Sequence, residues 1–309
     1  MIPQFSDLSK KALNWDNVAK GLLVFAIGLA KKVLVADNFG KIVDYGFGHI
    51  SSLNSFEALL AVLGYTIQIY FDFSGYCDMA VGIGLMFNIE LPQNFNSPYK
   101  ALSISDFWKR WHITLTNFLT KYIYIPLGGS RKGKIRTYLN ILIVFSISGL
   151  WHGAGYTFIL WGLMHGIAMV LERIMKSRYE RLPKAIRWIV TFAFINMTWV
   201  FFRAGSVTEA VAMLKQVFVG GWGFAINAEL TETLLQPTLI SIANRIVGLP
   251  VVSILACAAA LLTVLLLKNS TERLKTFRPS AGMWVQTYFL LILSILSVSG
   301  VSTFLYSNF

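Results

Sequence analysis

Two histidines lie within one apolar stretch of the chain, SGLWHGAGYTFILWGLMHG, which covers residues 148–166. His152 and His165 are each followed by glycine, and the whole sequence of 309 residues contains only four histidines. A neutral imidazole can accept a proton from a hydroxyl group, so a buried histidine is a candidate general base. A buried histidine can equally bridge two helices through its ring nitrogens. The elements that hold each ring decide between these roles.

The composition of the chain is typical of a membrane protein. Hydrophobic residues make up 55% of the sequence and charged residues 14%, against roughly 25% charged residues in an ordinary soluble domain. A transmembrane helix needs roughly 20 apolar residues. Apolar runs near that length occur at 17–35, 55–71, 74–89, 138–151, 155–172, 185–202, 250–267 and 283–306. We therefore expect an all-α, multi-pass transmembrane protein that forms a single domain over residues 1–309.

Basic residues gather in short segments between these runs. The net charge is +12, which in a soluble protein would suggest nucleic acid as a partner, but loops rich in Lys and Arg are typical of the cytoplasmic side of a membrane protein. We therefore expect no nucleic-acid binding, and we place residues 131–136, 173–187 and 268–278 in the cytoplasm. Residues 203–249 then form an outer segment, with a short amphipathic helix at Thr208–Val219. Lys31 and Lys32, near the end of the first run, can reach the lipid headgroups.

The position of His152 favours a catalytic role. The apolar run that leads to it, Tyr138–Trp151, has about 14 residues and rises only ~21 Å as a helix, whereas the hydrocarbon core is about 30 Å thick. Gly153-Ala154-Gly155 then breaks the helix and a second helix returns. Broken backbone at membrane depth is tolerated only where it is buried in protein or lines a cavity. Burial disfavours the charged imidazolium, so we expect a neutral ring that can act as a general base.

His165 and the remaining histidines give weaker signals. His165 lies between Gly162 and Gly166, a pattern that lets another helix approach closely, so we expect a structural hydrogen bond there. His112 lies in the segment 103–129, which we expect to be one amphipathic helix in the interface or entering the core. On that helix His112 would share a face with Trp108 and Thr116, and function and structure are equally supported. His49 is expected to be solvated.

The remaining polar residues do not indicate a second kind of functional site. Asp72 and Asp78 lie between two apolar runs, where they either cap helix ends or pair with Lys109 or Arg110 near the reaction cavity. No histidines are spaced i, i+4, and no cluster of His, Cys and acidic residues has ligand spacing, so we expect no metal. The glycines at 82–84 are interpreted as helix packing.

Several blocks in the sequence are similar to those of a known family. YFDFSGYCDMAVGIG, LPQNFNSPY, SISDFWKRWHITLTNFL, YIYIPLGGSRKG, SGLWHGAGYTFILWGLMHG, FFRAGSVTEAVAMLKQVF and the terminal FLYSNF follow in order along nearly the whole chain. They resemble the membrane-bound O-acyltransferases, and within them the bacterial alginate O-acetyltransferase type, related to the D-alanyl transferases of teichoic acids.

The resemblance implies an enzyme of a bacterial inner membrane, with broken and interfacial helices around a buried tunnel. It implies transfer of an acetyl group from acetyl-CoA, bound near the basic loops, to a hydroxyl of an exported polysaccharide or to an extracytoplasmic partner protein that passes the group on. The family's catalytic histidine matches His152 and its second motif histidine matches His112. We expect the other site residues to line the passage: Trp151, Trp108, Arg110, Asp106 and Tyr124.

Two features depart from the family pattern. Where the family often has an Arg-Asp pair before the YIYIPLGG block, this chain has Thr120-Lys121, which leaves the identity of the acceptor open. The sequence also begins at MIPQF, a point that looks internal to such proteins, so we expect the family's N-terminal helices to be missing. A transporter or flippase, or an inactive truncated acyltransferase, are the alternatives.

Overall fold

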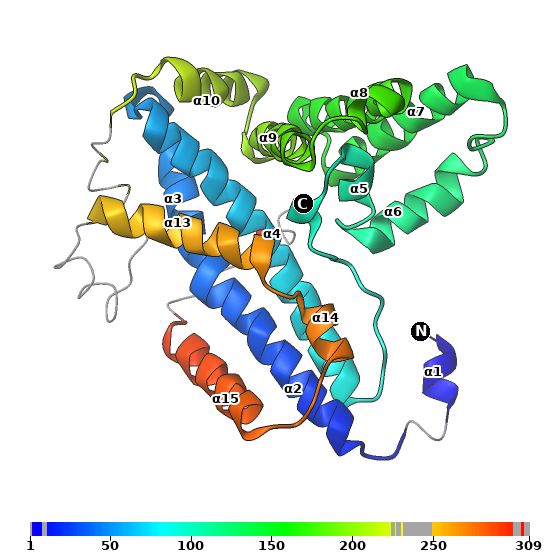
Figure 1. Ribbon diagram of the computed structural model, residues 1–309, viewed down its shortest axis with the longest axis vertical. Coiled ribbons are helices and arrows are strands. Elements are labelled where there is room, and N and C mark those ends of the chain that lie inside the picture. Colours follow the sequence, from blue (N-terminus) through cyan, green and yellow to red (C-terminus); the bar gives the residue numbers. More distant parts are fainter. Residues whose placement is uncertain are drawn as a thin grey trace. The chain divides into compact units, whose positions relative to one another are not determined.

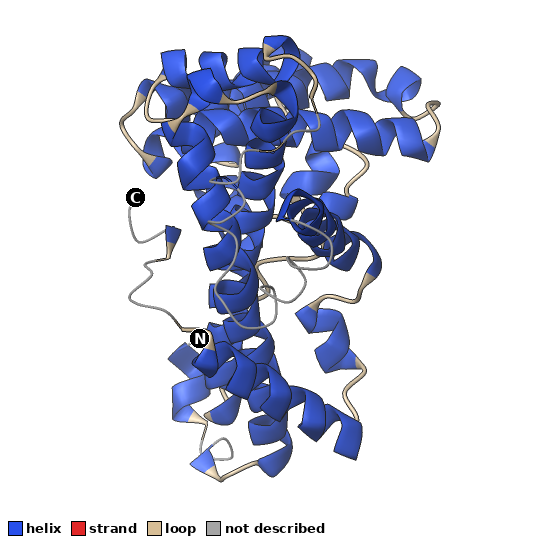
Figure 2. Cartoon of the chain, turned by 90° about the vertical axis from the view of Figure 1, so that its left-hand side faces the viewer, coloured by secondary structure: helices blue, strands red, loops and turns tan. Residues whose placement is uncertain are grey.

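The computed structural model describes residues 2–7, 11–223, 226, 230, 249–298 and 304–305. All regular elements in these ranges are helices, as Figure 2 shows, and none is a strand. This confirms the all-α fold class. The expected outer segment 203–249 and the run 283–306 lie partly outside the described residues.

Contacts divide the chain into two compact units. Unit 1 consists of Met1–Ile42, Ile67–Asn94 and Thr231–Asn308, and unit 2 consists mainly of Val43–Thr66 and Phe95–Leu230. The single domain expected over residues 1–309 stays a prediction. Two helices contribute residues to both units, namely α3 (Asp37–Gly48) and α4 (Ser55–Met86).

The remaining helices are labelled in Figure 1. Unit 1 contains α1 (Ile2–Ser6), α2 (Trp15–Ala30), a π-helix (Lys31–Ala36), α13 (Leu249–Leu266), α14 (Ser270–Lys275) and α15 (Ala281–Leu296). Unit 2 contains short 3-10 turns (Ile50–Ser52 and Pro98–Lys100), α5 (Ile104–Trp108), α6 (Ile113–Leu119), a π-helix (Thr120–Tyr124), α7 (Gly133–His152), α8 (Tyr156–Tyr179), α9 (Lys184–Arg203) and α10 (Val207–Val219).

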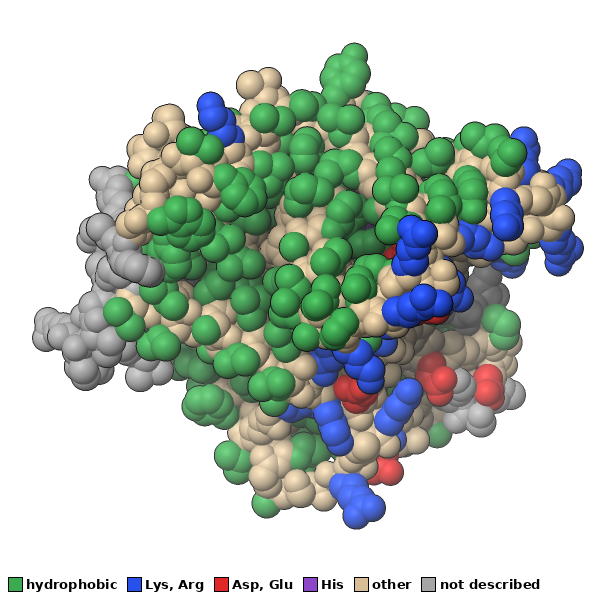
Figure 3. All heavy atoms as spheres, turned by 45° about the horizontal axis from the view of Figure 1, so that its top comes forward, with side chains coloured by type: hydrophobic (Ala, Val, Ile, Leu, Met, Phe, Trp, Pro, Cys, Tyr) green, Lys and Arg blue, Asp and Glu red, His purple; other side chains and the backbone are tan. Residues whose placement is uncertain are grey.

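Three described helices are long and apolar enough to cross a membrane: Ser55–Met86, Tyr156–Tyr179 and Lys184–Arg203. Shorter apolar helices occur at Ser253–Leu266 and Ala281–Leu296. Large hydrophobic side chains on α7, α8 and α9 are exposed, and Figure 3 shows hydrophobic side chains over much of the visible surface with basic side chains gathered apart from them. An apolar exterior of this kind suits contact with lipid tails. The orientation of the spans stays a prediction.

In unit 1, α2 and α4 approach each other through glycines. A Cβ atom added at Gly21 would lie 2.5 Å from the carbonyl oxygen of Gly82, and one added at Gly28 would lie 2.6 Å from that of Gly75. The two glycines of each helix are seven residues apart and therefore share a face. This contact confirms the interpretation of Gly82 as a packing residue.

The helix α4 runs unbroken through the segment that the sequence divides into two apolar runs. Asp72, Ser74 and Asp78 all lie inside it. The capping alternative for the carboxylates is therefore wrong, because neither Asp lies at a helix end. Within unit 1 each carboxylate pairs with a lysine of the adjacent π-helix, and the pairing with Lys109 or Arg110 stays a prediction. The Lys32 Nζ atom lies 2.7 Å from Asp72 Oδ1, and the Lys31 Nζ atom lies 2.6 Å from Asp78 Oδ2.

The two lysines do not reach outward as the sequence suggests. Lys32 is 6% exposed and Asp72 is 2% exposed. The backbone N–H of Leu305 donates a hydrogen bond of 2.9 Å to Asp72 Oδ2, which adds a second partner to that carboxylate. A buried charge is tolerated only when it is paired and hydrogen-bonded, so Asp72 holds Lys32 inside unit 1.

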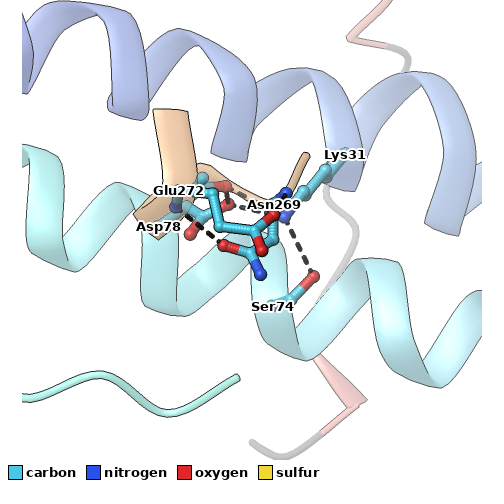
Figure 4. Close-up of polar contacts among 6 residues, drawn as sticks. Lys31, Ser74, Asp78, Asn269 and Glu272 are labelled. Atoms are coloured by element: carbon cyan, nitrogen blue, oxygen red, sulfur yellow. Dashed lines mark hydrogen bonds and ion pairs between the residues drawn. The ribbon is translucent and has the colours of Figure 1, made fainter. Parts of the chain in front are cut away.

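The second pair belongs to a larger polar cluster (Figure 4). Lys31 also donates to Ser74 Oγ at 3.3 Å, and Ser270 Oγ donates to Asp78 Oδ2 at 2.5 Å. Asn269 and Glu272 form a capping box at the start of α14, beside the Lys31 pair. The cluster therefore joins the start of α14 to the π-helix Lys31–Ala36 and to α4 within unit 1.

Candidate active site

The site is built on the antiparallel hairpin of α7 and α8, which lie side by side in Figure 1. The helix α7 covers Gly133–His152, so its 20 residues rise about 30 Å. The helix is longer than the apolar run 138–151 because it begins within the basic segment. It is not among the three described helices that are long and apolar enough to cross a membrane, so the expectation that it stops short of the far side stays a prediction. The expected break is present: α7 ends at His152, Gly153 is extended, and α8 begins at Tyr156.

Glycines allow the two helices of the hairpin to pack closely. A Cβ atom at Gly149 would overlap the carbonyl oxygen of Phe158, and one at Gly162 would overlap that of Phe145. One at Gly166 would lie 3.2 Å from the Phe145 side chain. The close approach expected at Gly162 and Gly166 is therefore confirmed.

His152 is enclosed by aromatic side chains at the end of α7. The residue is 3% exposed. Its ring centroid lies 5.2 Å from that of Trp161 on α8 and 5.1 Å from that of Phe202 on α9, both in edge-to-face geometry. The preceding residue, Trp151, lies 4.9 Å away by the same measure and is 59% exposed. One side of the imidazole thus packs against the buried rings of Trp161 and Phe202, and the exposed indole of Trp151 adjoins it.

His112 occupies a break in the segment that the sequence predicts to be one helix. Ser103 caps α5 by accepting a 3.1 Å hydrogen bond from the Asp106 N–H, but α5 ends at Trp108. His112 has a left-handed backbone (φ 44°, ψ 54°) and is the N-cap of α6. The prediction that His112 shares a helix face with Trp108 is therefore wrong.

The break nevertheless brings His112 to the end of α7. The His112 ring centroid lies 6.4 Å from that of Trp151, and the Trp151 ring in turn lies 4.9 Å from that of His152, both in edge-to-face geometry. Residues 40 positions apart in sequence thus meet within unit 2. Two imidazoles and one indole form the candidate site.

His165 holds a different position. It is fully buried, and its Nδ1 accepts a 3.1 Å hydrogen bond from the indole N–H of Trp108. Aromatic rings of Phe107, Phe145 and Trp161 lie within 6.5 Å of it, measured between ring centroids. The structural hydrogen bond expected for His165 is confirmed. Its partner is the indole N–H of Trp108, which is the one hydrogen-bond donor of that side chain.

The other predicted site residues are engaged in local structure. Arg110 Nε lies 2.7 Å from Asp106 Oδ1, and each side chain is about one-third exposed. Asp106 Oδ2 also accepts from the Leu102 N–H at 3.2 Å. The Tyr124 hydroxyl lies 2.7 Å from Ser130 Oγ. The described contacts bring none of Arg110, Asp106 and Tyr124 to His152, and their role in lining a passage stays a prediction.

Sequence reasoning missed three residues that shape this site. Trp161 and Phe202 form the wall against His152, and Glu172 on α8 accepts hydrogen bonds from the backbone of α5. A signal exists for Trp161, which lies one helical turn before His165. For Phe202 and Glu172, only the folding of distant segments brings the partners together.

The described residues contain no group of three or more His, Cys, Asp or Glu side chains that could hold a metal ion. A surface pocket of about 440 Å³ belongs to unit 1, where it is lined by Ala12, Leu13, Asn14, Trp15, Asp16, Asn17, Asn88 and Glu90. None of the predicted site residues lines that pocket.

Comparisons with known proteins agree with the sequence resemblance. The model of the membrane-bound O-acyltransferase family matches residues 2–207. The peptidoglycan O-acetyltransferase of Helicobacter pylori is 45% identical over the full chain, which covers 60% of that relative. A probable alginate O-acetylase of Pseudomonas aeruginosa is 41% identical over 67% of the chain, equal to 40% of its own length.

A more distant relative is the teichoic acid D-alanyltransferase of Bacillus subtilis, 31% identical over 44% of the chain and 38% of its own length. The chain thus spans between about four-tenths and six-tenths of the length of these relatives. The family match covers well over half of the chain and includes α7, α8 and the candidate site. This chain belongs to the membrane-bound O-acyltransferase family.

Proposed function

We propose that this protein is a multi-pass O-acyltransferase of a bacterial inner membrane. It transfers an acetyl group from acetyl-CoA to a hydroxyl of an exported polysaccharide, or to an extracytoplasmic partner that acetylates the polysaccharide. The observation that carries the proposal is the meeting of His112, Trp151 and the buried His152 at the break between α7 and α8. Family membership supports the reaction class.

His152 is the proposed general base. Its ring nitrogen takes the proton of the acceptor hydroxyl while the hydroxyl oxygen attacks the thioester carbonyl carbon. The C–S bond then breaks, and the proton held on His152 passes to the leaving sulfur, which yields the free thiol of CoA. Burial among Trp161 and Phe202 keeps the resting ring neutral, because a charged imidazolium has no water to solvate it there.

His112 is proposed to orient or polarise a reactant beside His152. Trp151, which adjoins both imidazoles, is proposed to shape the entrance. Trp108 is proposed to act indirectly, through its packing, because its indole N–H is hydrogen-bonded to His165. Arg110, Asp106 and Tyr124 complete the proposed lining of the passage. The exposed basic residues of 131–136 and 173–187 are proposed to bind the phosphates of acetyl-CoA on the cytoplasmic side.

The acceptor is proposed to be a polysaccharide hydroxyl because the relatives are named for such polymers. Alginate is named for the Pseudomonas relative, and peptidoglycan is named for the Helicobacter relative that matches the full chain. Both polymers offer hydroxyl groups, so the same base and the same donor suit either acceptor.

Transfer of radiolabelled acetyl from acetyl-CoA by the purified chain tests the proposal. His152→Ala should lower the rate by roughly 10²- to 10⁴-fold, the usual contribution of a general base. His49→Ala is the matched control, because the His49 side chain is exposed and its Nδ1 lies 3.0 Å from the backbone carbonyl oxygen of Tyr45, four residues earlier. Full acetyl transfer by His152→Ala would refute the assigned base. Movement of an unmodified solute across vesicles, without thioester turnover, would favour a transporter.

A further inference from the structure

One face of α8 contacts both His152 and the short helix α5. Trp161, His165, Met169 and Glu172 follow one another at spacings of four, four and three residues, so they lie along one face of the helix. Trp161 packs on the His152 ring, as described above. The other three contact α5, the short helix that precedes the turn to His112.

At the C-terminal end of α5, His165 fixes Trp108. The indole N–H donates to His165 Nδ1 at 3.1 Å, and both side chains are at least nine-tenths buried. The rings also meet edge to face, with centroids 5.1 Å apart. Because a hydrogen bond buried among aromatic rings has no water to replace either partner, this contact holds one end of α5 firmly.

At the N-terminal end of α5, Glu172 supplies a carboxylate. Its Oε2 accepts hydrogen bonds from the backbone N–H of Ile104 at 2.7 Å and of Ser105 at 3.2 Å. The Ser105 hydroxyl also lies 3.4 Å from the sulfur of Met169. The first N–H groups of a helix have no partner within it, and a negative charge there is favoured by the helix dipole.

The helix α5 depends on these contacts, because five residues are far too few for a stable helix alone. The chain passes from Trp108 through residues 109–111 to His112, whose left-handed backbone turns it into α6. Because only three residues separate α5 from His112, we expect a movement of α5 to shift His112 relative to Trp151.

We propose that Glu172 and His165 are positioning residues that clamp α5 to α8 and thereby hold His112 beside Trp151 and His152. The same helix face supports His152 through Trp161, so α8 fixes the positions of the imidazoles of both His112 and His152. The clamp itself is independent of the reaction, but its kinetic consequence rests on the proposed acyl transfer.

The first test measures the clamp directly by hydrogen–deuterium exchange of the backbone amides of 104–112. Glu172→Leu should accelerate exchange in this peptide, and Glu172→Gln, which keeps a side-chain oxygen acceptor, should restore most of the protection. Glu180→Leu is the matched control, since Glu180 is exposed and lies 3.8 Å from Lys176. Unchanged exchange in Glu172→Leu would overturn the clamp whatever the activity.

The second test measures catalysis by the folded protein. A misplacement of about 1 Å can cost on the order of 10²-fold in rate, so kcat of Glu172→Leu should fall by about that factor while KM changes little. His165→Phe should show the same split, and Glu172→Gln should recover most of the kcat. Accelerated exchange with an unchanged kcat would overturn the positioning role.

The two tests also separate the clamp from the proposed function. If the unmodified chain transfers no acyl group, the proposed function fails and the exchange measurement still decides the clamp. If Glu172→Leu yields no folded protein, His165→Phe and Glu172→Gln undergo both measurements in its place.

Discussion

The buried pair of Lys32 and Asp72 offers a quantitative test of how unit 1 tolerates charge. Lys32 Nζ lies 2.7 Å from Asp72 Oδ1 and 2.8 Å from Asp37 Oδ1. The Asp72 side chain is 2% exposed, whereas the Asp37 side chain is 25% exposed. Lys32 therefore joins one deeply buried carboxylate to one that water can reach. Removal of the Asp72 charge and removal of the Lys32 charge should consequently lower the free energy of unfolding by different amounts.

Coulomb attraction at the 2.7 Å separation of Lys32 and Asp72 amounts to about 6 kcal/mol for an effective dielectric constant of about 20. Desolvation offsets much of it, and removal of one partner from a buried pair costs about 3–5 kcal/mol. Asp72→Asn leaves Lys32 with Asp37, so we expect a loss near the lower end, about 3 kcal/mol. Lys32→Met strands Asp72 with the single N–H of Leu305, so we expect a loss near the upper end, about 5 kcal/mol.

The assay is equilibrium unfolding of the purified protein in mixed dodecyl maltoside and SDS micelles, followed by far-ultraviolet circular dichroism. The double variant Lys32→Met/Asp72→Leu removes both charges and should unfold within about 1 kcal/mol of the unmodified protein, because well-packed apolar replacements of buried pairs are often neutral. The reasoning fails if Asp72→Asn costs more than Lys32→Met, or if the double variant is as unstable as the single ones.

Three further variants test packing and surface charge by the same unfolding assay. Gly162→Ala places a methyl group against the Phe145 carbonyl, so we expect a loss of about 1–3 kcal/mol from overpacking. Gly282→Ala, where no atom lies within 4 Å, should keep or raise the stability by up to about 1 kcal/mol, and an equal loss in both would contradict the packing argument. Asp44→Asn breaks the 2.7 Å pair with Arg203, but Asp44 is 71% exposed, so a loss above about 1 kcal/mol would show that surface pairs matter here.

Elements with a strong local signal are predictable from this sequence. The run 185–202 becomes α9 (Lys184–Arg203), and the amphipathic helix expected at Thr208–Val219 becomes α10 (Val207–Val219). In both, the hydrophobic pattern lies within the element itself, and in α10 a local side-chain cap adds to it. Ser206, for example, accepts from the Glu209 N–H at 3.1 Å and so fixes the start of α10.

Elements whose form depends on a distant partner are not predictable in this way. Asp72 and Asp78 look like an interruption, yet lysines 40 and 47 positions earlier pair with them and α4 continues. The segment 103–129 shows the converse error. Its amphipathic pattern suits one helix, but Glu172 and His165 hold a five-residue α5 that ends before the turn at His112.

The burial of His152 does not depend on the length of α7. Its isolation from water was inferred from an apolar run too short to cross the lipid, and the 20 residues of α7 include the basic start of the helix, so α7 is not among the described helices apolar enough to span. The structure supplies a different cause of burial: Trp161 from α8 and Phe202 from α9 enclose the ring, which is 3% exposed. A proton acceptor needs exclusion of water from the ring rather than a given depth in the bilayer, because the loss of hydration is what disfavours imidazolium. The proposed general base therefore depends on the packing of three helices within unit 2, and a change that opened the Trp161 wall would weaken it even with α7 intact.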